Sequence, residues 1–269
     1  MQDDKNLKRA TTAASEAARS VGALMRRHLP DAKKANEVTQ HDIKLELDVR
    51  SQKLIERTLR SAFPNVALLG EEGTAGDPNA EHRWVVDPID GTVNFAYGIP
   101  HACVSIALQQ QTGDPKLAGY HDGYRTLVGV VYDPFCDEMW TAIRGQPSRL
   151  NGRPIRVSKR SKLDEAIVSI GFAKDRATLE HMLPYFNQLV RRVRKTRIMG
   201  AAALALTYVA TGRFDAYIAR SISIWDIAAG GLIVECAGGD FSRKPIPGEH
   251  KYAMIASNGL VQRSLRPPN

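Results

Sequence analysis

Strand-like and helix-like patterns alternate along residues 166–256, and this alternation constrains the fold more than any other feature of the sequence. Short apolar runs are separated by longer segments whose apolar residues recur at helical spacing. The predicted order is strand Ile167–Ile170, helix Arg176–Leu189, strand Val193–Ile198, helix Ala201–Ala210, strand Phe214–Ile218, helix Trp225–Ala237 and strand Tyr252–Ala256. Because helices that alternate with strands cover the faces of a sheet, the pattern predicts an α/β layer system.

The first half of the chain predicts two helices and then a run of strands. The helices cover Asn6–Leu29 and Leu47–Phe63, and a proline, which cannot continue a helix, follows each of them. The predicted strands are Val66–Leu69, Arg83–Val86, Val104–Leu108, Leu127–Tyr132 and Glu138–Ile143, with a turn at Asn151–Gly152. Tight turns between the later strands indicate antiparallel pairing. We therefore expect an α+β lobe of residues 1–160 and an α/β lobe of residues 161–269, which share one cleft.

Charge and cysteine content narrow the class of protein. The 37 Lys and Arg residues exceed the 29 Asp and Glu residues, and a net charge of +8 suits a nucleic-acid binder, an enzyme for phosphorylated substrates or simple solubility. The densest basic run, Arg191–Arg197, has no interleaved aromatic residues, so we interpret it as a solvated edge and predict no nucleic-acid partner. The three cysteines form no C-x-x-C pair, which argues against a zinc site and a disulfide framework.

No membrane or secretion signal is visible in the sequence. Met1–Lys5 is charged and lacks the apolar core of a secretory signal. The longest apolar stretches, Ala201–Leu206 and Ile227–Val234, are far shorter than the roughly 20 residues that span a bilayer. We therefore predict a cytoplasmic protein without a membrane partner.

Acidic residues stand where three apolar elements begin or end. Glu71–Glu72 follows one predicted strand, Asp87 to Thr92 follows the next, and Asp226 opens a helix of small apolar residues. Each group alone can be structural, because aspartate is common in turns and as a helix cap. All-oxygen, carboxylate-rich sites, however, select Mg²⁺, Mn²⁺ or Ca²⁺.

The segment Asp87-Pro88-Ile89-Asp90-Gly91-Thr92 favours a metal site over a purely structural turn. Its two carboxylates are three residues apart on a turn that proline stiffens and glycine ends. The backbone N–H groups of Gly91 and Thr92, at a predicted helix start, can bind a phosphate. Two metals close together can activate a water and stabilise a leaving oxygen in phosphoryl transfer.

These motifs resemble the inositol monophosphatase family. Trp84–Phe95 resembles the first signature of the family and Trp225–Glu235 its second, while Gly70–Glu72 and Ala237–Gly239 match the elements that precede and follow them. The resemblance implies a layered α-β-α-β-α sandwich of the fructose-1,6-bisphosphatase-like class, formed from α+β and α/β parts. It also implies a lithium-sensitive phosphomonoesterase that uses two or three Mg²⁺ ions, for which Mn²⁺ can substitute, and that forms a homodimer.

The resemblance further implies a role for each acidic residue. Glu71 and Asp87 would hold the first metal with the Ile89 carbonyl, and Asp87 would bridge to a second metal held by Asp90 and Asp226. Glu72 would support these ligands from behind. The catalytic residues would be Glu71, Thr92 and Asp48, because Thr92 and Asp48 would orient and help deprotonate the attacking water. Gly91, Thr92, Asp90 and Asp226 would contact the substrate.

The substrate is left open by two departures from the family pattern. A glutamate that contacts inositol is expected where this chain has Ala219, and Ala201 stands where Ser or Thr is common. Arg220 can instead meet a second anionic group, or point to solvent or to a partner subunit. The candidate substrates are therefore inositol monophosphate or a related sugar or polyol phosphate and, as alternatives, fructose bisphosphate, histidinol phosphate, adenosine bisphosphate and NADP. A non-catalytic anion-binding role is the further alternative.

Overall fold

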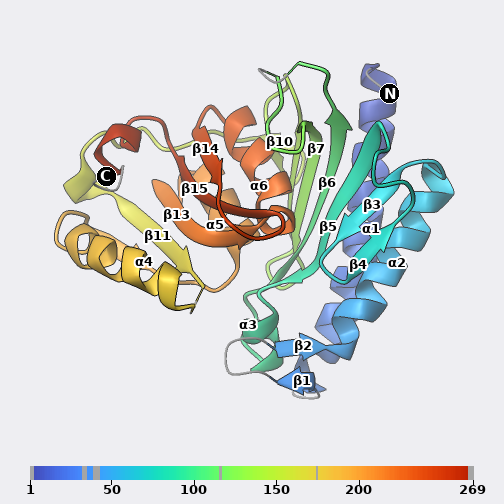
Figure 1. Ribbon diagram of the computed structural model, residues 1–269, viewed down its shortest axis with the longest axis horizontal. Helices are drawn as coiled ribbons and strands as arrows, with labels where there is room; N and C mark the ends of the chain where they lie inside the picture. Colours follow the sequence, from blue (N-terminus) through green and yellow to red (C-terminus); the bar gives the residue numbers. More distant parts are fainter. Residues whose placement is uncertain (1–2, 32–34, 39–42, 115–116, 174, 266–269) are drawn as a thin grey trace.

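The computed structural model shows alternating layers of helices and sheets (Figure 1) and describes residues 3–31, 35–38, 43–114, 117–173 and 175–265. Helices α1 (Asp4–His28) and α2 (Glu46–Ala62) cover one face of a first sheet. Helices α5 (Ala202–Ala210) and α6 (Ile224–Cys236) lie between the two sheets, and α4 (Arg176–Leu189) covers the outer face of the second. The α-β-α-β-α sandwich predicted from the sequence is confirmed.

The first sheet has eight strands in the order β10-β9-β8-β7-β6-β5-β3-β4. Its strands are β3 (Ala67–Gly70), β4 (Gly73–Ala75), β5 (His82–Asp90), β6 (Cys103–Gln111), β7 (Tyr124–Asp133), β8 (Glu138–Ile143), β9 (Arg149–Leu150) and β10 (Arg153–Pro154). Strands β5 to β10 pair antiparallel, as predicted, while β3 and β5 run parallel. The parallel pair is important for the site, because its register places Glu71, directly after β3, beside Asp87 of β5.

The second sheet has five strands in the order β12-β11-β13-β15-β14. Its strands are β11 (Ile167–Phe172), β12 (Lys195–Arg197), β13 (Ala216–Ser223), β14 (Asp240–Pro245) and β15 (Lys251–Ser257). Strand β11 is parallel to β12 and β13, with α4 and α5 as the crossover helices, whereas β15 is antiparallel to both of its neighbours. The predicted alternation of strands and helices is therefore confirmed. The sequence did not predict β14, an edge strand whose residues are mostly polar.

The remaining elements are short. A hairpin of β1 (Ala35–Val38) and β2 (Ile43–Leu45) lies beside α3 (Thr92–Ala96), and three 3₁₀ turns cover Leu29–Asp31, Leu163–Glu165 and Gln262–Leu265. Within the described ranges, no helix is long and apolar enough to cross a membrane. The division into lobes 1–160 and 161–269 stays a prediction.

Small residues set how closely α6 approaches the first sheet. A Cβ atom on Gly129 of β7 would lie 2.6 Å from the Ala229 carbonyl oxygen of α6, closer than carbon and oxygen can pack. On the other side of α6, a Cβ on Gly230 would lie 2.7 Å from Leu206 of α5. The glycines therefore allow a tightly packed central layer, which places the N-terminal turn of α6 beside the end of β5.

One local prediction was wrong. The segment Asp87–Asp90 does not form a free turn, because β5 continues to Asp90 and pairs again with Cys103 of β6. The pairing register shifts between Asp87 and Asp90, which is a β-bulge. Such an irregularity accommodates Pro88, which has no N–H to give to the ladder.

Candidate metal centre

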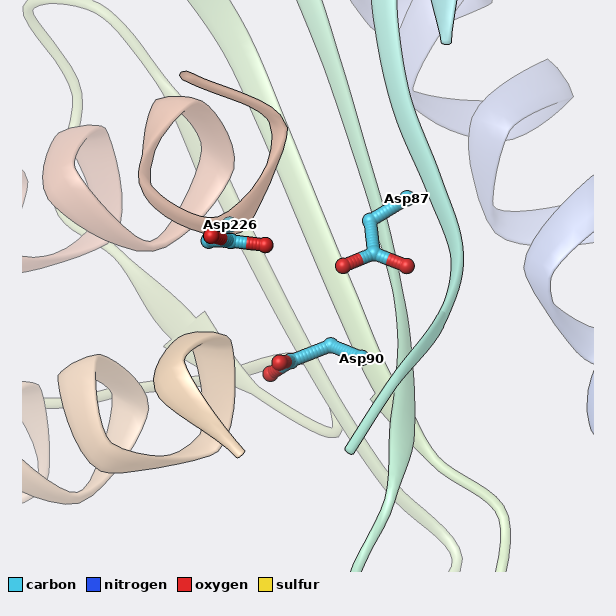
Figure 2. A group of neighbouring side chains, drawn as sticks. All are labelled: Asp87, Asp90 and Asp226. Atoms are coloured by element: carbon cyan, nitrogen blue, oxygen red, sulfur yellow. The ribbon is translucent and has the colours of Figure 1, made fainter. Parts of the chain in front are cut away.

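Three aspartates from two distant parts of the chain face one another in the structure. Asp87 and Asp90 come from the second half of β5, and Asp226 comes from the first turn of α6. One carboxylate oxygen from each lies within 4.8 Å of the others. Figure 2 shows the three carboxylates turned toward a common space between β5 and the start of α6. The two signatures, 136 residues apart between Asp90 and Asp226 (226 − 90), thus meet at one site.

The Asp90 carboxylate is held by the start of α5. It accepts hydrogen bonds from the backbone N–H of Ala202 at 3.0 Å and of Ala203 at 2.6 Å, and the Cys103 thiol lies 3.6 Å away. These amides are among those that a helix leaves without an internal partner at its N-terminus. Asp90 therefore has a fixed orientation before any ligand binds.

Asp226 and Asp87 are also oriented by backbone amides. Asp226 accepts a hydrogen bond from the Ser223 N–H at 2.9 Å, which places it as the third residue of α6 rather than as the N-cap considered from the sequence. Asp87 accepts one from the Ile89 N–H at 3.0 Å. Lys251 donates to the Ser223 hydroxyl at 2.7 Å, behind this turn. Both aspartates thus keep lone pairs for a cation.

Burial and mutual repulsion raise the pKa values of the clustered carboxyls. Burial, followed by the charge of Asp226, raises the pKa of Asp90 to about 7. Burial, followed by Asp226 and Asp48, raises the pKa of Glu71 to about 8. For Asp87, burial and the charges of Glu71 and Asp90 raise the pKa well above its usual range. Charges that repel one another in this way are stabilised by a bound divalent cation.

The donor set fits a hard cation. Asp87 and Asp90 are nearly buried, at 1% and 7% exposure, and their free donor atoms are carboxylate oxygens. Oxygen donors favour Mg²⁺, Mn²⁺ or Ca²⁺ over zinc, which prefers nitrogen and sulfur. The residues present therefore fit the metals predicted from the sequence.

Glu71 and Glu72 lie directly after β3, at the edge of this centre. The Glu71 N–H donates to the Val86 carbonyl at 3.1 Å, which ties the end of β3 to β5. The residue keeps a solvent-exposed part, as a side chain at the mouth of an open site does. Its carboxyl lies close enough to Asp87 for a hydrogen bond between them, which partly opposes the rise in its pKa. The structure thus brings Glu71 to the three aspartates.

Gln52 is a residue that the sequence analysis missed. Its side-chain carbonyl accepts from the Glu72 N–H at 2.9 Å, and its amide donates to the Gly73 carbonyl at 3.0 Å. It is buried on α2, one turn after Asp48, which is also buried and whose charge contributes to the raised pKa of Glu71. Two polar residues spaced four apart on the buried face of a helix were the signal that could have identified Gln52.

The start of α3 depends on Gly91. Gly91 has φ of 91°, in the left-handed region that favours glycine, and a Cβ there would lie 2.9 Å from the His101 carbonyl oxygen. The Thr92 hydroxyl donates to the Ile89 carbonyl at 2.9 Å. Thr92 and Ile89 therefore lie side by side where the sequence predicted a water-orienting hydroxyl and a metal-binding carbonyl.

A pocket of about 240 Å³ adjoins the acidic centre. Asp90 and Asp226 form one side of it, and residues of β11, α5, β13 and the connection before α5 form the rest. The sequence analysis gave no role in the site to its wall residues Phe172, Ile198 and Tyr217. They carry no catalytic pattern, and only the packing of the second sheet against α5 brings them to the site.

Ala219 and Arg220 line a different cavity. They border a groove between α4 and the strands β13 to β15, together with residues such as Glu180 and Lys244. The Thr178 N–H lowers the pKa of Asp175 most, and the positive charge of Arg220 lowers it further, which places Arg220 near the start of α4. Arg220 thus lies outside the pocket beside the aspartates, whereas Ala219 packs in the same buried cluster as Tyr217, a wall residue of that pocket.

Fold and acidic centre together define a layered α/β protein with a carboxylate cluster that could hold a metal ion. Comparison with known proteins is consistent with this class: the model of the inositol monophosphatase family matches residues 6–245, so the chain belongs to this family. The family assignment made from the two signatures is confirmed, and it supports a phosphatase.

Several relatives share most of their length with this chain. A protein of Pseudomonas aeruginosa named Nus factor SuhB is 39% identical, with 94% of this chain and 92% of that protein covered. The Inositol-1-monophosphatase of Rhizobium meliloti is 37% identical, with 81% of this chain and 79% of that protein covered. The crystal structure of the extragenic suppressor protein suhB from Bartonella henselae superposes with a TM-score of 0.83 at 32% identity, covering 94% of this chain and 95% of that one. None of these comparisons tests whether the protein binds nucleic acid, so the absence of a nucleic-acid partner stays a prediction.

Proposed function

We propose that this protein hydrolyses a small phosphate monoester with the help of Mg²⁺. The observation that carries the proposal is the convergence of Asp87, Asp90 and Asp226 within 4.8 Å, in a chain of the inositol monophosphatase family. When bound, two or three Mg²⁺ ions would neutralise charge and activate water for in-line attack on phosphorus. Mn²⁺ would replace them, and Li⁺ would inhibit.

The residues of the site would have separate roles in binding metal, water and phosphate. Glu71, Asp87 and the Ile89 carbonyl would hold one cation, and Asp87, Asp90 and Asp226 the next. Thr92 and Asp48, with Glu71, would orient the attacking water and take up its proton. The N–H groups of Gly91 and Thr92 would hold phosphate oxygens, as N–H groups at a helix start can. Glu72, whose N–H is held by Gln52 at 2.9 Å, would support the first ligand from behind.

Phosphate release tests this proposal. The assay would compare inositol 1-phosphate, fructose 1,6-bisphosphate, histidinol phosphate, adenosine 3′,5′-bisphosphate and NADP, with and without Mg²⁺ and with added Li⁺. We expect turnover of at least one of them that requires Mg²⁺. The matched pair of variants is Asp87→Asn, which should lose turnover by orders of magnitude, and Asp164→Asn, an exposed aspartate outside the site, which should not.

Two outcomes would contradict the proposal. If Asp87→Asn kept near-normal Mg²⁺-dependent turnover, the carboxylates would not be the metal ligands. If a folded protein bound Mg²⁺ but turned over no phosphate ester, the anion-binding alternative would replace the phosphatase.

We also propose that the protein is cytoplasmic and that it forms a homodimer, the latter as the family resemblance implies. Light scattering after size-exclusion chromatography tests the dimer, since a mass of twice 29.6 kDa supports it and a mass of 29.6 kDa contradicts it.

A further inference from the structure

A groove of about 790 Å³ lies on the outer face of the second sheet. Helix α4 packs over β11 and β13, and Figure 1 shows it next to β11 at the outer side of this sheet. Within the described ranges, no second helix longer than the 3₁₀ turn Gln262–Leu265 covers the outer face of β15 and β14. The groove shares no lining residue with the pocket that Asp90 and Asp226 border. Its volume falls within the range of small-molecule binding sites.

Strand pairing places two cations in one row along the groove. Arg220 of β13 pairs with Ala253 of β15, and Ala253 pairs in turn with Lys244 of β14. Paired residues of neighbouring strands point to the same face, so the Arg220 and Lys244 side chains flank the small side chain of Ala253. Their backbones are ~10 Å apart, since neighbouring strands are ~4.8 Å apart, and both long side chains can reach one anion between them. A third cation, Arg243, is engaged elsewhere, because its guanidinium donates to the Gly119 carbonyl.

The two cations have no close anionic partner in the described part of the chain. There, Arg220 and Lys244 make no ion pair and no hydrogen bond. The acid at the edge of the groove, Glu180, accepts from the Arg176 guanidinium at 2.8 Å. Asp175, the N-cap of α4, interacts with the charge of Arg220 only at longer range. The groove therefore keeps positive charge available for an anion.

Apolar surface adjoins the two cations. The neighbouring row of the sheet, two residues back along β13, consists of Ile218 paired with Ile255 of β15. Met182, Pro184 and Tyr185 of α4 form the wall beside this row. The remaining polar side chains that line the groove are His181, Gln188 and Ser242. A ligand with an anionic head and an apolar body would therefore find a matching surface for both of its parts.

We propose that this groove binds a small organic phosphate that has an apolar body. The phosphate would lie over Ala253, between Arg220 and Lys244, because its double negative charge matches two cations. The apolar body would lie on Ile218 and Ile255, against α4. A free molecule fits better than a lipid headgroup in a membrane, because the apolar floor lies inside a groove beside α4. The site is separate from the acidic centre, so the proposal does not depend on the phosphatase function.

Calorimetry in EDTA tests the proposal, because without metal the acidic centre repels anions. Octyl phosphate, below its micelle-forming concentration, carries both parts of the ligand. Inorganic phosphate carries the head alone, and octylammonium carries the same chain with the opposite charge. We expect octyl phosphate to bind at one site per chain, at least tenfold more tightly than inorganic phosphate, without saturable binding of octylammonium. Absence of octyl phosphate binding, equal binding of the two phosphates, or equal binding of octylammonium would overturn the proposal.

Variants of the two cations locate the bound phosphate. Arg220→Gln and Lys244→Gln should each weaken octyl phosphate binding about fivefold or more, because each removes one of the two charges that face the phosphate. Both side chains reach solvent, so the folded structure should persist, as a thermal melt would check. Arg153→Gln is the matched control, because Arg153 is an exposed strand residue on β10 of the first sheet. Unchanged affinity in both groove variants would contradict the assignment.

Two further measurements separate this groove from other binding sites. Asp87→Asn, which alters the acidic centre, should leave the affinity for octyl phosphate in EDTA unchanged. A changed affinity in that variant would place the ligand at the acidic centre and overturn the proposal. Sedimentation with phosphatidic acid vesicles tests the membrane alternative. Vesicle binding that Arg220→Gln abolishes, without binding of free octyl phosphate, would replace the free ligand by a membrane surface.

Discussion

The acidic centre and the opposite wall of the pocket are built in different ways. The aspartates of the centre are nearly or partly buried, and backbone amides of β5, α5 and the last residue of β13 orient them. The wall residues Phe172 and Ile198 keep exposed surface, and strand pairing of β11 with β13 and the connection before α5 place them. Substitutions in the centre should therefore impair its chemistry, whereas side chains of the wall can change without disturbing the centre.

The largest effect that would sharpen this comparison is expected for Asp226→Asn. Removal of one carboxylate should lower turnover about a thousandfold, because it takes away several kcal/mol of stabilisation that the bound metals supply. In EDTA, by contrast, the melting temperature should stay the same or rise, since one repelling charge is gone. Steady-state kinetics and thermal melts measure both effects. A variant that loses stability in EDTA would show that Asp226 is mainly a structural cap.

For a buried carboxylate outside the site, we expect substitution to lower stability. Asp215 is fully buried, yet it accepts hydrogen bonds from the Arg160 guanidinium at 2.8 Å and from the Ile167 N–H at 2.8 Å. Asp215→Ala should lower the free energy of unfolding by about 3 kcal/mol, because it leaves the Ile167 amide and the partly exposed Arg160 guanidinium without their shared partner. Urea denaturation measures this loss. Reduced activity without reduced stability would mean that Asp215 belongs to the site.

The pH dependence of stability tests the repulsion within the centre. Asp90 and Glu71 have folded-state pKa values of about 7 and about 8, above their ordinary values, so the folded chain binds more protons than the unfolded chain at intermediate pH. Without metal, their contribution to stability is therefore fully present below about pH 4 and is lost as pH rises through 7 and 8. Between pH 6 and 8.5 we expect the melting temperature in EDTA to fall by several degrees.

Mg²⁺ should reverse this trend, because the cation competes with protons for the same oxygens. The rise in melting temperature on adding Mg²⁺ should be larger at pH 8.5 than at pH 6. An equal rise at both values would contradict the coupling of protons and metal at this centre.

The smallest effect is expected from Gln52→Ala, which reaches the centre only through the turn at Glu71 and Glu72. Loss of two hydrogen bonds should cost about 1–2 kcal/mol of stability and raise the Mg²⁺ concentration for half-maximal activity a fewfold. Turnover at saturating Mg²⁺ should change less. Gln188→Ala, on the exposed side of α4, is the control. A loss of turnover that Mg²⁺ cannot restore would assign Gln52 a direct part in catalysis.

Much of this architecture could be predicted because it is encoded locally. Arg176–Leu189 forms α4 with the predicted bounds, and Leu47–Phe63 differs from α2 by one residue at each end, because apolar periodicity and flanking prolines act over a few residues. The acidic residues were recognised because two signatures carry them in order. The path of β5 through Asp87–Asp90 and the edge strand β14 were not predicted, because pairing with β6 and β15 outweighed local turn and charge patterns.

The sequence by itself determined the class of chemistry, since the carboxylates that suit Mg²⁺ stand in two recognisable segments and the glycines beside them permit close packing. Only the tertiary structure decided which side chains share the pocket with those carboxylates. Phe172, Ile198 and Tyr217 come from three separate segments, and Ala219 and Arg220 border another groove. The physical reason is that a metal site needs particular donor atoms, which leave a pattern in the chain, whereas a pocket wall is defined by its shape, which arises only when distant elements pack.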